Sequence, residues 1–312
     1  MEILINVILT AGRSAVELSL FILLPVMVVM LSLMRLLEAK GVLDWLVAKL
    51  APVLKPLGLT GLGVFAALQI NFVSFAAPIA TLTMLDQRGA SERHIAATLA
   101  MVMAMAQANV VFPMVAMGLQ FGSVLLFSLL GGLVAASATY YGFGRHLSSQ
   151  EKPMDETLQH PVAETAKGVL DVINRAGAEA FKIAVNAIPM LVLSLTVIMA
   201  LRTGGAIDAL TRALSPLMVW LQLDEGLILL TLTKVLAGGT AMMGVMDEML
   251  RKGAASTLLL NQSAGLLISP LDIPGVAVLI SAGRRVANVW RPAVLGACIG
   301  ILVRTLGHAY LS

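Results

Sequence analysis

Long apolar stretches follow one another along this chain. The stretches from Ala15 to Leu36 and from Val124 to Phe143 each have the roughly 20 residues that a helix needs to cross a hydrocarbon core of about 30 Å. They lack the period-2 alternation of membrane β-barrel strands. Hydrophobic residues make up 58% of the sequence and charged residues only 12%, which is more apolar surface than a soluble fold could bury. The sequence therefore predicts an all-α integral membrane protein.

The second half of the chain repeats the first at an offset of 164 residues. The matched positions are Pro25 and Pro189, Gly41 and Gly205, Asp44 and Asp208, Pro52 and Pro216, Arg88 and Lys252, and Gly89 and Gly253. Residues this sparse rarely coincide so often at one spacing by chance. We therefore predict two copies of one module, residues 1–147 and 166–312. The segment 148–165 joins them, and its charges and its two prolines are typical of a solvated linker.

Each copy shows the same order of segments. A spanning helix is followed by an amphipathic stretch lying in the membrane interface, a broken apolar segment, a helix with a polar interruption and a closing helix. In the first copy these segments are 15–36, 41–58, 59–85, 95–119 (interrupted at Gln107, Asn109 and Pro113) and 124–143. In the second copy they are 183–201, 205–223, 226–249, 258–280 and 293–311.

The broken segments are predicted to enter the membrane and return as re-entrant hairpins. This arrangement places most Lys and Arg residues on one side, as membrane insertion favours, whereas letting the broken segments cross weakens that bias. Each copy then has three spanning helices, so the copies are inverted and their hairpins enter from opposite faces. The linker and the turns around Arg88 and Arg284 would be cytoplasmic, and Arg251 would face outward, in a multi-pass protein of a bacterial inner membrane.

Polar residues at the interruptions are the candidates for binding a solute. Amides supply both donors and acceptors, which suits a polar neutral molecule, although each amide is also explained by hydrogen bonding between helices. The candidate substrate-binding residues are Gln69, Asn71, Ser74, Gln107, Asn109, Lys234, Thr240, Asn261, Gln262, Ser269 and Asp272.

Lys234 and Asp272 are the ionisable residues nearest the middle of apolar segments. A charge in lipid is costly unless it is paired or hydrated, so we expect the two side chains to lie within reach of each other or of a common cavity. Lys234 could neutralise an anionic group and Asp272 could carry a coupling H⁺ or Na⁺. Equally, the two could form an ion pair that only fixes the helices.

Other chemistries lack support in the sequence. The single cysteine, Cys298, allows no internal disulfide or redox pair, and the four histidines lie at helix ends or in the linker, so no metal site is predicted. No nucleotide-binding loop or hydrolase motif is present, so we predict neither an enzyme nor a cofactor. A net charge of +3 without a basic cluster gives no sign of nucleic-acid binding.

Two adjacent stretches resemble a known family. "NFVSFAAP" at 71–78 and "ASERHIAATLAMVMAMAQAN" at 90–109 resemble the hairpin tip and following helix of the Gate, or nucleoside recognition, domain. That domain occurs in concentrative nucleoside transporters, in the membrane part of ferrous iron transporter B and in spore maturation proteins A and B. The order of segments over nearly the whole chain resembles spore maturation proteins A and B fused end to end.

The resemblance implies inverted repeats with two re-entrant hairpins and, in transporters, a substrate held between hairpin tips and unwound helices. The ribose-gripping Gln-Thr-Glu type of tip is replaced here by Val73, Ser74, Phe75 and Ala76, without a carboxylate. The leading hypothesis is a membrane transporter of a small polar solute, nucleoside-like or another metabolite, which allows for a homo-oligomer. The alternative is a membrane scaffold or accessory protein in a cell-envelope process, whose centre could be filled with side chains.

Overall fold

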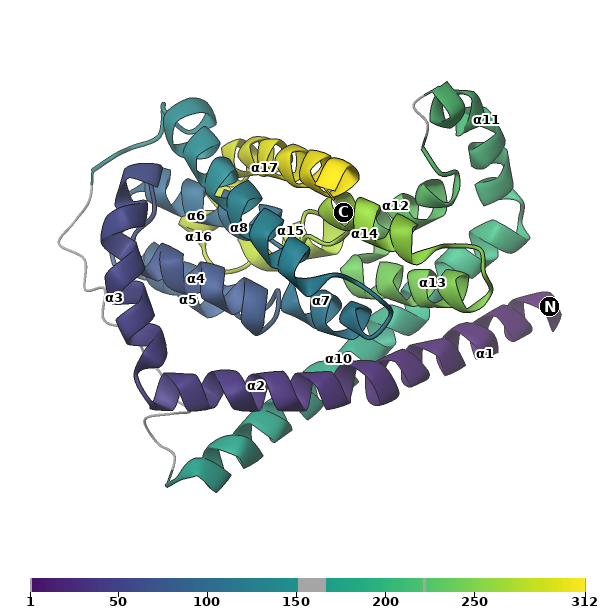
Figure 1. The fold of residues 1–312 in the computed structure, drawn as a ribbon, viewed down its shortest axis with the longest axis horizontal. Coiled ribbons are helices and arrows are strands. Elements are labelled where there is room, and N and C mark those ends of the chain that lie inside the picture. Colours follow the sequence, from purple (N-terminus) through teal and green to yellow (C-terminus); the bar gives the residue numbers. More distant parts are fainter. Residues whose placement is uncertain (1, 151–166, 221–222, 312) are drawn as a thin grey trace.

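The computed structural model describes residues 2–150, 167–220 and 223–311. The described residues form helices joined by short turns, without strands, as the sequence predicts (Figure 1). The first half contains α1 (Glu2–Glu17), η1 (Leu18–Leu23), α2 (Leu24–Ala39), α3 (Val42–Leu54), η2 (Lys55–Leu57), α4 (Gly61–Phe72), α5 (Pro78–Gln87), α6 (Glu92–Ala104), α7 (Ala108–Val115), α8 (Phe121–Ser137) and η3 (Ala138–Phe143). The second contains α10 (Val169–Thr203), α11 (Ala206–Trp220), α12 (Gly226–Ala237), α13 (Gly239–Arg251), α14 (Thr257–Leu267), α15 (Ile273–Ile280), α16 (Arg284–Asn288) and α17 (Trp290–Leu311).

The two halves follow the same order of elements. Gly41 and Gly205 end the first long helix of each half with positive φ angles of 68° and 74°, a conformation that glycine adopts without a steric penalty. Gly89 and Gly253 likewise share positive φ, at 87° and 67°. The repeated glycines therefore mark equivalent turns, which explains why they stand out in the sequence.

The first long helix of each half is longer than predicted. In the first half α1, η1 and α2 continue one another from Glu2 to Ala39, and in the second α10 extends from Val169 to Thr203. The π-helical turn η1 comes just before Pro25, whose ring and missing N–H prevent regular α-helical bonding to the preceding turn. The residues before Ala15 thus belong to the first long helix, because neither a proline nor a turn separates them from it.

Both predicted broken segments consist of two helices that pack against each other, and each such pair is called a hairpin below. In the first, α4 and α5 are separated by residues 73–77, and in the second, α12 and α13 are separated by Gly238 alone. Gly238 has φ +86° and ψ 171°, which allows the chain to reverse in one residue. The hairpins lie on opposite sides of the molecule's centre, α4 and α5 on the left and α12 and α13 on the right in Figure 1.

The helices after the hairpins are both interrupted. The first break lies at Met105–Gln107, between α6 and α7, and the second at Ile268–Asp272, between α14 and α15. Asn109 and Pro113, which were expected to belong to the first interruption, lie inside α7. As the sixth residue of the eight-residue α7, Pro113 removes the helical hydrogen bond to the carbonyl of Asn109, and the helix ends two residues later.

Five stretches of the described residues are helical, long and apolar enough to span a membrane. They are Ile5–Ala39, Glu92–Val115, Phe121–Phe143, Val169–Thr203 and Trp290–Leu311. The sixth predicted crossing, 258–280, is divided into α14 and α15 by its break. Most of the predicted linker, from residue 151 onward, lies outside the described residues.

The two repeats do not pack as separate units. α10 of the second half packs along α1 and α2, and α17 packs against α6 and α8 of the first half as well as against α14. One core cluster contains Leu62, Leu99 and Ala135 from the first half together with Val286 and Ala297 from the second. The two halves therefore form one interlocked body, and this packing brings the two hairpin tips to the two helix breaks.

Candidate functional site

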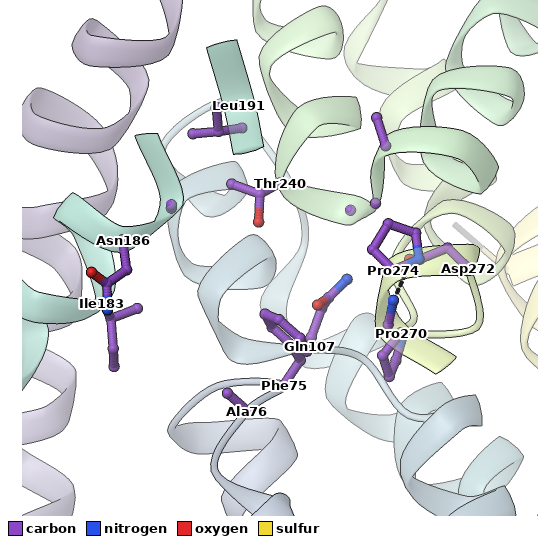
Figure 2. A pocket seen from close by; sticks show the side chains of 15 residues that line it. Phe75, Ala76, Gln107, Ile183, Asn186, Leu191, Thr240, Pro270, Asp272 and Pro274 are labelled. Carbon is purple, nitrogen blue, oxygen red and sulfur yellow. Dashed lines mark hydrogen bonds between the residues drawn. The ribbon is translucent and has the colours of Figure 1, made fainter. Parts of the chain in front are cut away.

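A cavity of about 330 Å³ lies where the hairpin tips meet the helix breaks. Its walls come from five places in the chain that are distant in sequence (Figure 2). These are the first tip (Phe75, Ala76), the first break (Gln107), α10 (Ile183, Asn186, Ala187, Leu191), the second tip (Ala237, Gly238, Gly239, Thr240) and the second break with the start of α15 (Pro270, Asp272, Pro274, Gly275). The lining is mainly apolar with a few polar groups, which is typical of small-molecule sites.

Asn109 joins the two hairpin tips. Its Oδ1 accepts a hydrogen bond from the backbone N–H of Phe75 in the first tip, at 3.2 Å. Its Nδ2 donates to Oγ1 of Thr240 in the second hairpin, at 3.4 Å. Asn109 is placed for this role because it is the second residue of α7, directly after the first break. One buried amide therefore couples both tips to a broken helix.

Gln107 links the two breaks across the cavity. Its Nε2 donates to the backbone carbonyl of Ser269 at 3.3 Å, and in Figure 2 its side chain points toward the second break. The hydroxyl of Ser269 is fully buried and has no hydrogen-bond partner among the described residues. A Cβ atom at Gly239 would overlap Nε2 of Gln107. Position 239 in the second tip is therefore glycine, because a side chain there would collide with the amide of Gln107.

Asp272 is the one charged residue among the described residues that line the cavity. Its Oδ1 accepts from the backbone N–H of Gly275 at 2.7 Å and so caps the N-terminus of α15. The backbone amide of Gly239, at the start of α13, also faces this carboxylate. Two helix N-termini therefore point at Asp272, and both favour its negative charge.

Lys234, on α12, lies beside Asp272 of the second break. Its ammonium group donates to the backbone carbonyl of Leu271 and is close enough to the Asp272 carboxylate for the two charges to attract. Lys234 is only 5% exposed and is not part of the cavity lining, whereas Asp272 is. The two charges therefore flank one stretch of unwound backbone, and only the carboxylate faces the cavity.

The remaining predicted residues lie away from the cavity. Gln69 accepts from Thr81 at 2.7 Å within the first hairpin, and Asn71 accepts from Ser128 at 2.6 Å and so ties that hairpin to α8. Asn261 holds the turn before α8, accepting from the backbone N–H of Gln120 and donating to the carbonyl of Gly118. Ser74 is buried in the first tip and Gln262 is half-buried on α14. These five side chains are placed to support the site and not to line it.

Asn186 and Phe75 line the cavity but were not among the predicted binding residues. Asn186 is an isolated polar residue in the apolar stretch of α10, three positions before Pro189, and that polar position was the available signal. Phe75 was noted only as part of a tip without a carboxylate. Its aromatic ring gives no polar signal in the sequence, although the structure places it at the cavity wall (Figure 2).

Replacing Asn109 with alanine is expected to loosen both tips. The backbone N–H of Phe75 would lose its acceptor, and leaving a buried group unsatisfied costs about 1–3 kcal/mol. Thermal unfolding of the purified protein in detergent would show a lower midpoint for Asn109→Ala, with Asn109→Asp, which keeps the acceptor, in between. The matched control is Asn186→Ala on α10, because the side chain of Asn186 is exposed. Equal midpoints for Asn109→Ala and the control would contradict this role.

Comparisons with known proteins agree with this architecture. Residues 20–123, which contain the first hairpin and the first broken helix, match the family model of the Gate domain, described as nucleoside recognition. None of the curated proteins matches the chain in sequence.

Solved structures of CNTnw are similar to the whole chain. The inward-facing, substrate-bound state of CNTnw has a TM-score of 0.68 at 18% identity, covering 97% of this chain and 82% of CNTnw. A double variant of CNTnw in an outward-facing state has a TM-score of 0.67, also at 18% identity, with 97% and 81% covered. A variant in an intermediate state has a TM-score of 0.64 at 17% identity, with 93% and 76% covered. The chain thus contains a region that matches the Gate, or nucleoside recognition, domain, and it has the fold of CNTnw.

Proposed function

We propose that this chain is a membrane transporter for a small polar solute, nucleoside-like or another metabolite. The observation that carries the proposal is the cavity of about 330 Å³ at the junction of both hairpin tips and both helix breaks. Its size is at the lower end of the range of about 300–1,000 Å³ for small-molecule sites. Helix ends at such a junction present backbone amides and carbonyls to a bound solute. A scaffold would need no such space at its centre.

A nucleoside suits the chemistry of the lining. The ring of Phe75 offers an apolar face to a base, while Gln107 and Thr240 offer a donor and an acceptor to polar edges. The first tip lacks a carboxylate, and Asp272 from the other half supplies one to the same cavity. In this proposal these four residues contact the solute, and the other predicted residues hold the tips and breaks in place. The match of residues 20–123 to the nucleoside recognition model supports the same solute class.

The two hairpins are proposed to enter the membrane from opposite faces, in inverted repeats. The distribution of Lys and Arg supports this orientation, and so do the positions of the hairpins on opposite sides of the centre (Figure 1). A cysteine placed at Arg251 in a Cys298→Ala background should react with an impermeant thiol reagent added outside intact bacterial cells. One placed at Arg88 should react only after the cells are opened. Labelling of both from the same side would rule out the inversion.

Uptake into liposomes tests the transport proposal. Purified protein in proteoliposomes should accumulate radiolabelled nucleosides from a panel that also includes free bases, sugars and amino acids. Imposed H⁺ and Na⁺ gradients, compared separately, would identify a coupling ion. Empty liposomes and liposomes with Gln107→Ala are the controls, and Gln107→Ala should reduce uptake because it removes a cavity-lining amide. Uptake equal to that of empty liposomes for every solute would contradict a transporter.

A further inference from the structure

Arg304 is a fully buried cation that the function described above does not use. It lies on α17 and is 0% exposed. Its Nη1 donates to the backbone carbonyl of Ala104, and its Nη2 donates to the carbonyl of Ile268 at 2.8 Å. One guanidinium group therefore bridges the first half of the chain to the second.

The two carbonyls are equivalent points of the repeat. Ala104 is the last residue of α6 and Ile268 is the residue that caps the end of α14, so both stand where a broken helix ends. They are separated by the same 164 positions that separate the repeated prolines and glycines. A helix C-terminus carries partial negative charge, and a cation placed there is stabilising. Arg304 therefore lies where two such ends converge.

The unwound backbone of the second break has a donor for each carbonyl from Ile268 to Leu271. The side chain of Arg304 donates a hydrogen bond to the carbonyl of Ile268, that of Gln107 to the carbonyl of Ser269, and that of Lys234 to the carbonyl of Leu271. The carbonyl of Pro270 accepts from the backbone N–H of Asp272 at 3.0 Å. Unwound carbonyls in transporters are the groups that coordinate coupling cations, and here two of the four are held by cationic side chains of the protein itself.

The packing around Arg304 leaves room for its side chain. A Cβ atom at Gly131, on α8, would overlap Cγ of Arg304. A Cβ atom at Gly265, on α14, would lie 2.5 Å from the backbone carbonyl carbon of Arg304. α8 therefore has a glycine where the side chain of Arg304 packs against it, and α14 has a glycine where the backbone of α17 packs against it.

We propose that Arg304 is a fixed internal cation that holds the two helix breaks together, in the place that a bound cation would otherwise take at these carbonyl ends. Arg304 is a positioning residue and does not line the cavity. It fixes the helix ends at Ala104 and Ile268, and the cavity-lining residues Gln107 and Asp272 follow these ends by three and four positions. This role goes beyond the proposed transport, because it concerns the geometry of the breaks whatever solute the cavity holds.

Chemical rescue tests the role of Arg304. Arg304→Ala leaves a space at the two carbonyls that a guanidinium ion fits, so millimolar guanidinium should raise the thermal midpoint of this variant in detergent. Tetramethylammonium at the same concentration, which has no N–H donors, should not raise it. The matched control is Arg291→Ala, which removes an exposed arginine from the same helix and should respond to neither salt. An identical response of Arg304→Ala to both salts, or a midpoint equal to that of the control, would overturn the proposal.

A second readout follows the cavity itself. In a Cys298→Ala background, a cysteine replacing Ala76 in the cavity wall should react with a small charged thiol reagent. Adding Arg304→Ala should speed this reaction by about tenfold or more, because the two helix ends next to the cavity walls would no longer be held, and guanidinium should reverse the increase.

If Arg304→Ala does not fold, two further variants keep the test decisive. Arg304→Lys retains the charge and should keep partial stability, whereas Arg304→Met retains only the packing and should be clearly less stable than Arg304→Lys. Equal stability and equal cysteine reactivity of the Lys and Met variants would overturn the proposal. None of these readouts depends on uptake, so failure of the transport assay and failure of this proposal are distinguishable.

Discussion

Replacing Gly265 with alanine is expected to lower the stability of the folded protein by about 3 kcal/mol, the upper end of the usual cost of overpacking. A Cβ atom there would lie 2.5 Å from the backbone carbonyl carbon and oxygen of Arg304 and 2.6 Å from the backbone nitrogen of Thr305. Because these are main-chain atoms, no rotamer change relieves the overlap, and α14 would have to move away from α17. Denaturant titration in detergent, monitored by circular dichroism, measures the effect.

Gly122→Ala is the control for this prediction. Gly122 lies in α8 with nothing within 4 Å of the position of an added Cβ. Alanine there should be neutral or stabilise the helix by about 0.5–1 kcal/mol. If Gly265→Ala were as stable as Gly122→Ala, the close contact between α14 and α17 would be wrong.

Gly239→Ala is expected to reduce uptake about tenfold or more. A tenfold reduction needs a loss of only about 1.4 kcal/mol in the free energy of solute binding. The added Cβ would overlap Nε2 of Gln107, so this amide would have to leave the carbonyl of Ser269 and move into the cavity. The methyl group would stand at the second tip, beside Val110. Initial rates of nucleoside uptake into proteoliposomes, at equal protein content, measure the effect.

The control is Gly177→Ala on α10, where nothing lies within 4 Å of the added Cβ. It should leave the rate of uptake unchanged. Gly239→Ala should still fold, with a lowered thermal midpoint, because the overlapping atom is the end of a side chain that can turn but the carbonyl of Ser269 loses its donor. Normal uptake by Gly239→Ala would mean that the solute does not pass between Gln107 and the second tip.

The sequence allowed the positions of the main interruptions to be predicted. Gly238 lies in the second predicted broken segment, and Ser269 and Asp272 lie in the predicted interruption of the following helix. Glycine and proline both disfavour regular helix, although Pro113 lies inside α7 and Pro189 inside α10. The repeat offset predicted equivalent turns at Gly41 and Gly205 for the same local reason. Such features depend on a few neighbouring residues, so they can be read without knowing the fold.

Long-range placement could not be predicted in the same way. Asn109 was a candidate, but that its amide joins both hairpin tips depends on how the two halves interlock. Asn71 has the same side chain and belongs to the packing of the first hairpin against α8. Arg304 was not a candidate, because the sequence does not show that the ends of α6 and α14 converge on α17. Residue type alone does not distinguish these roles, since each depends on contacts between distant segments.

The most direct test of the proposed transport site is a reversible block of the cavity. Thr240→Cys in a Cys298→Ala background places the sole thiol in the cavity wall at the second tip. Modification with a bulky methanethiosulfonate reagent should stop nucleoside uptake into proteoliposomes, and reduction with dithiothreitol should restore it. The Cys298→Ala protein without the new cysteine should be unaffected by either treatment. Continued uptake at the full rate by protein whose Cys at position 240 is completely modified would contradict a solute pathway through this cavity.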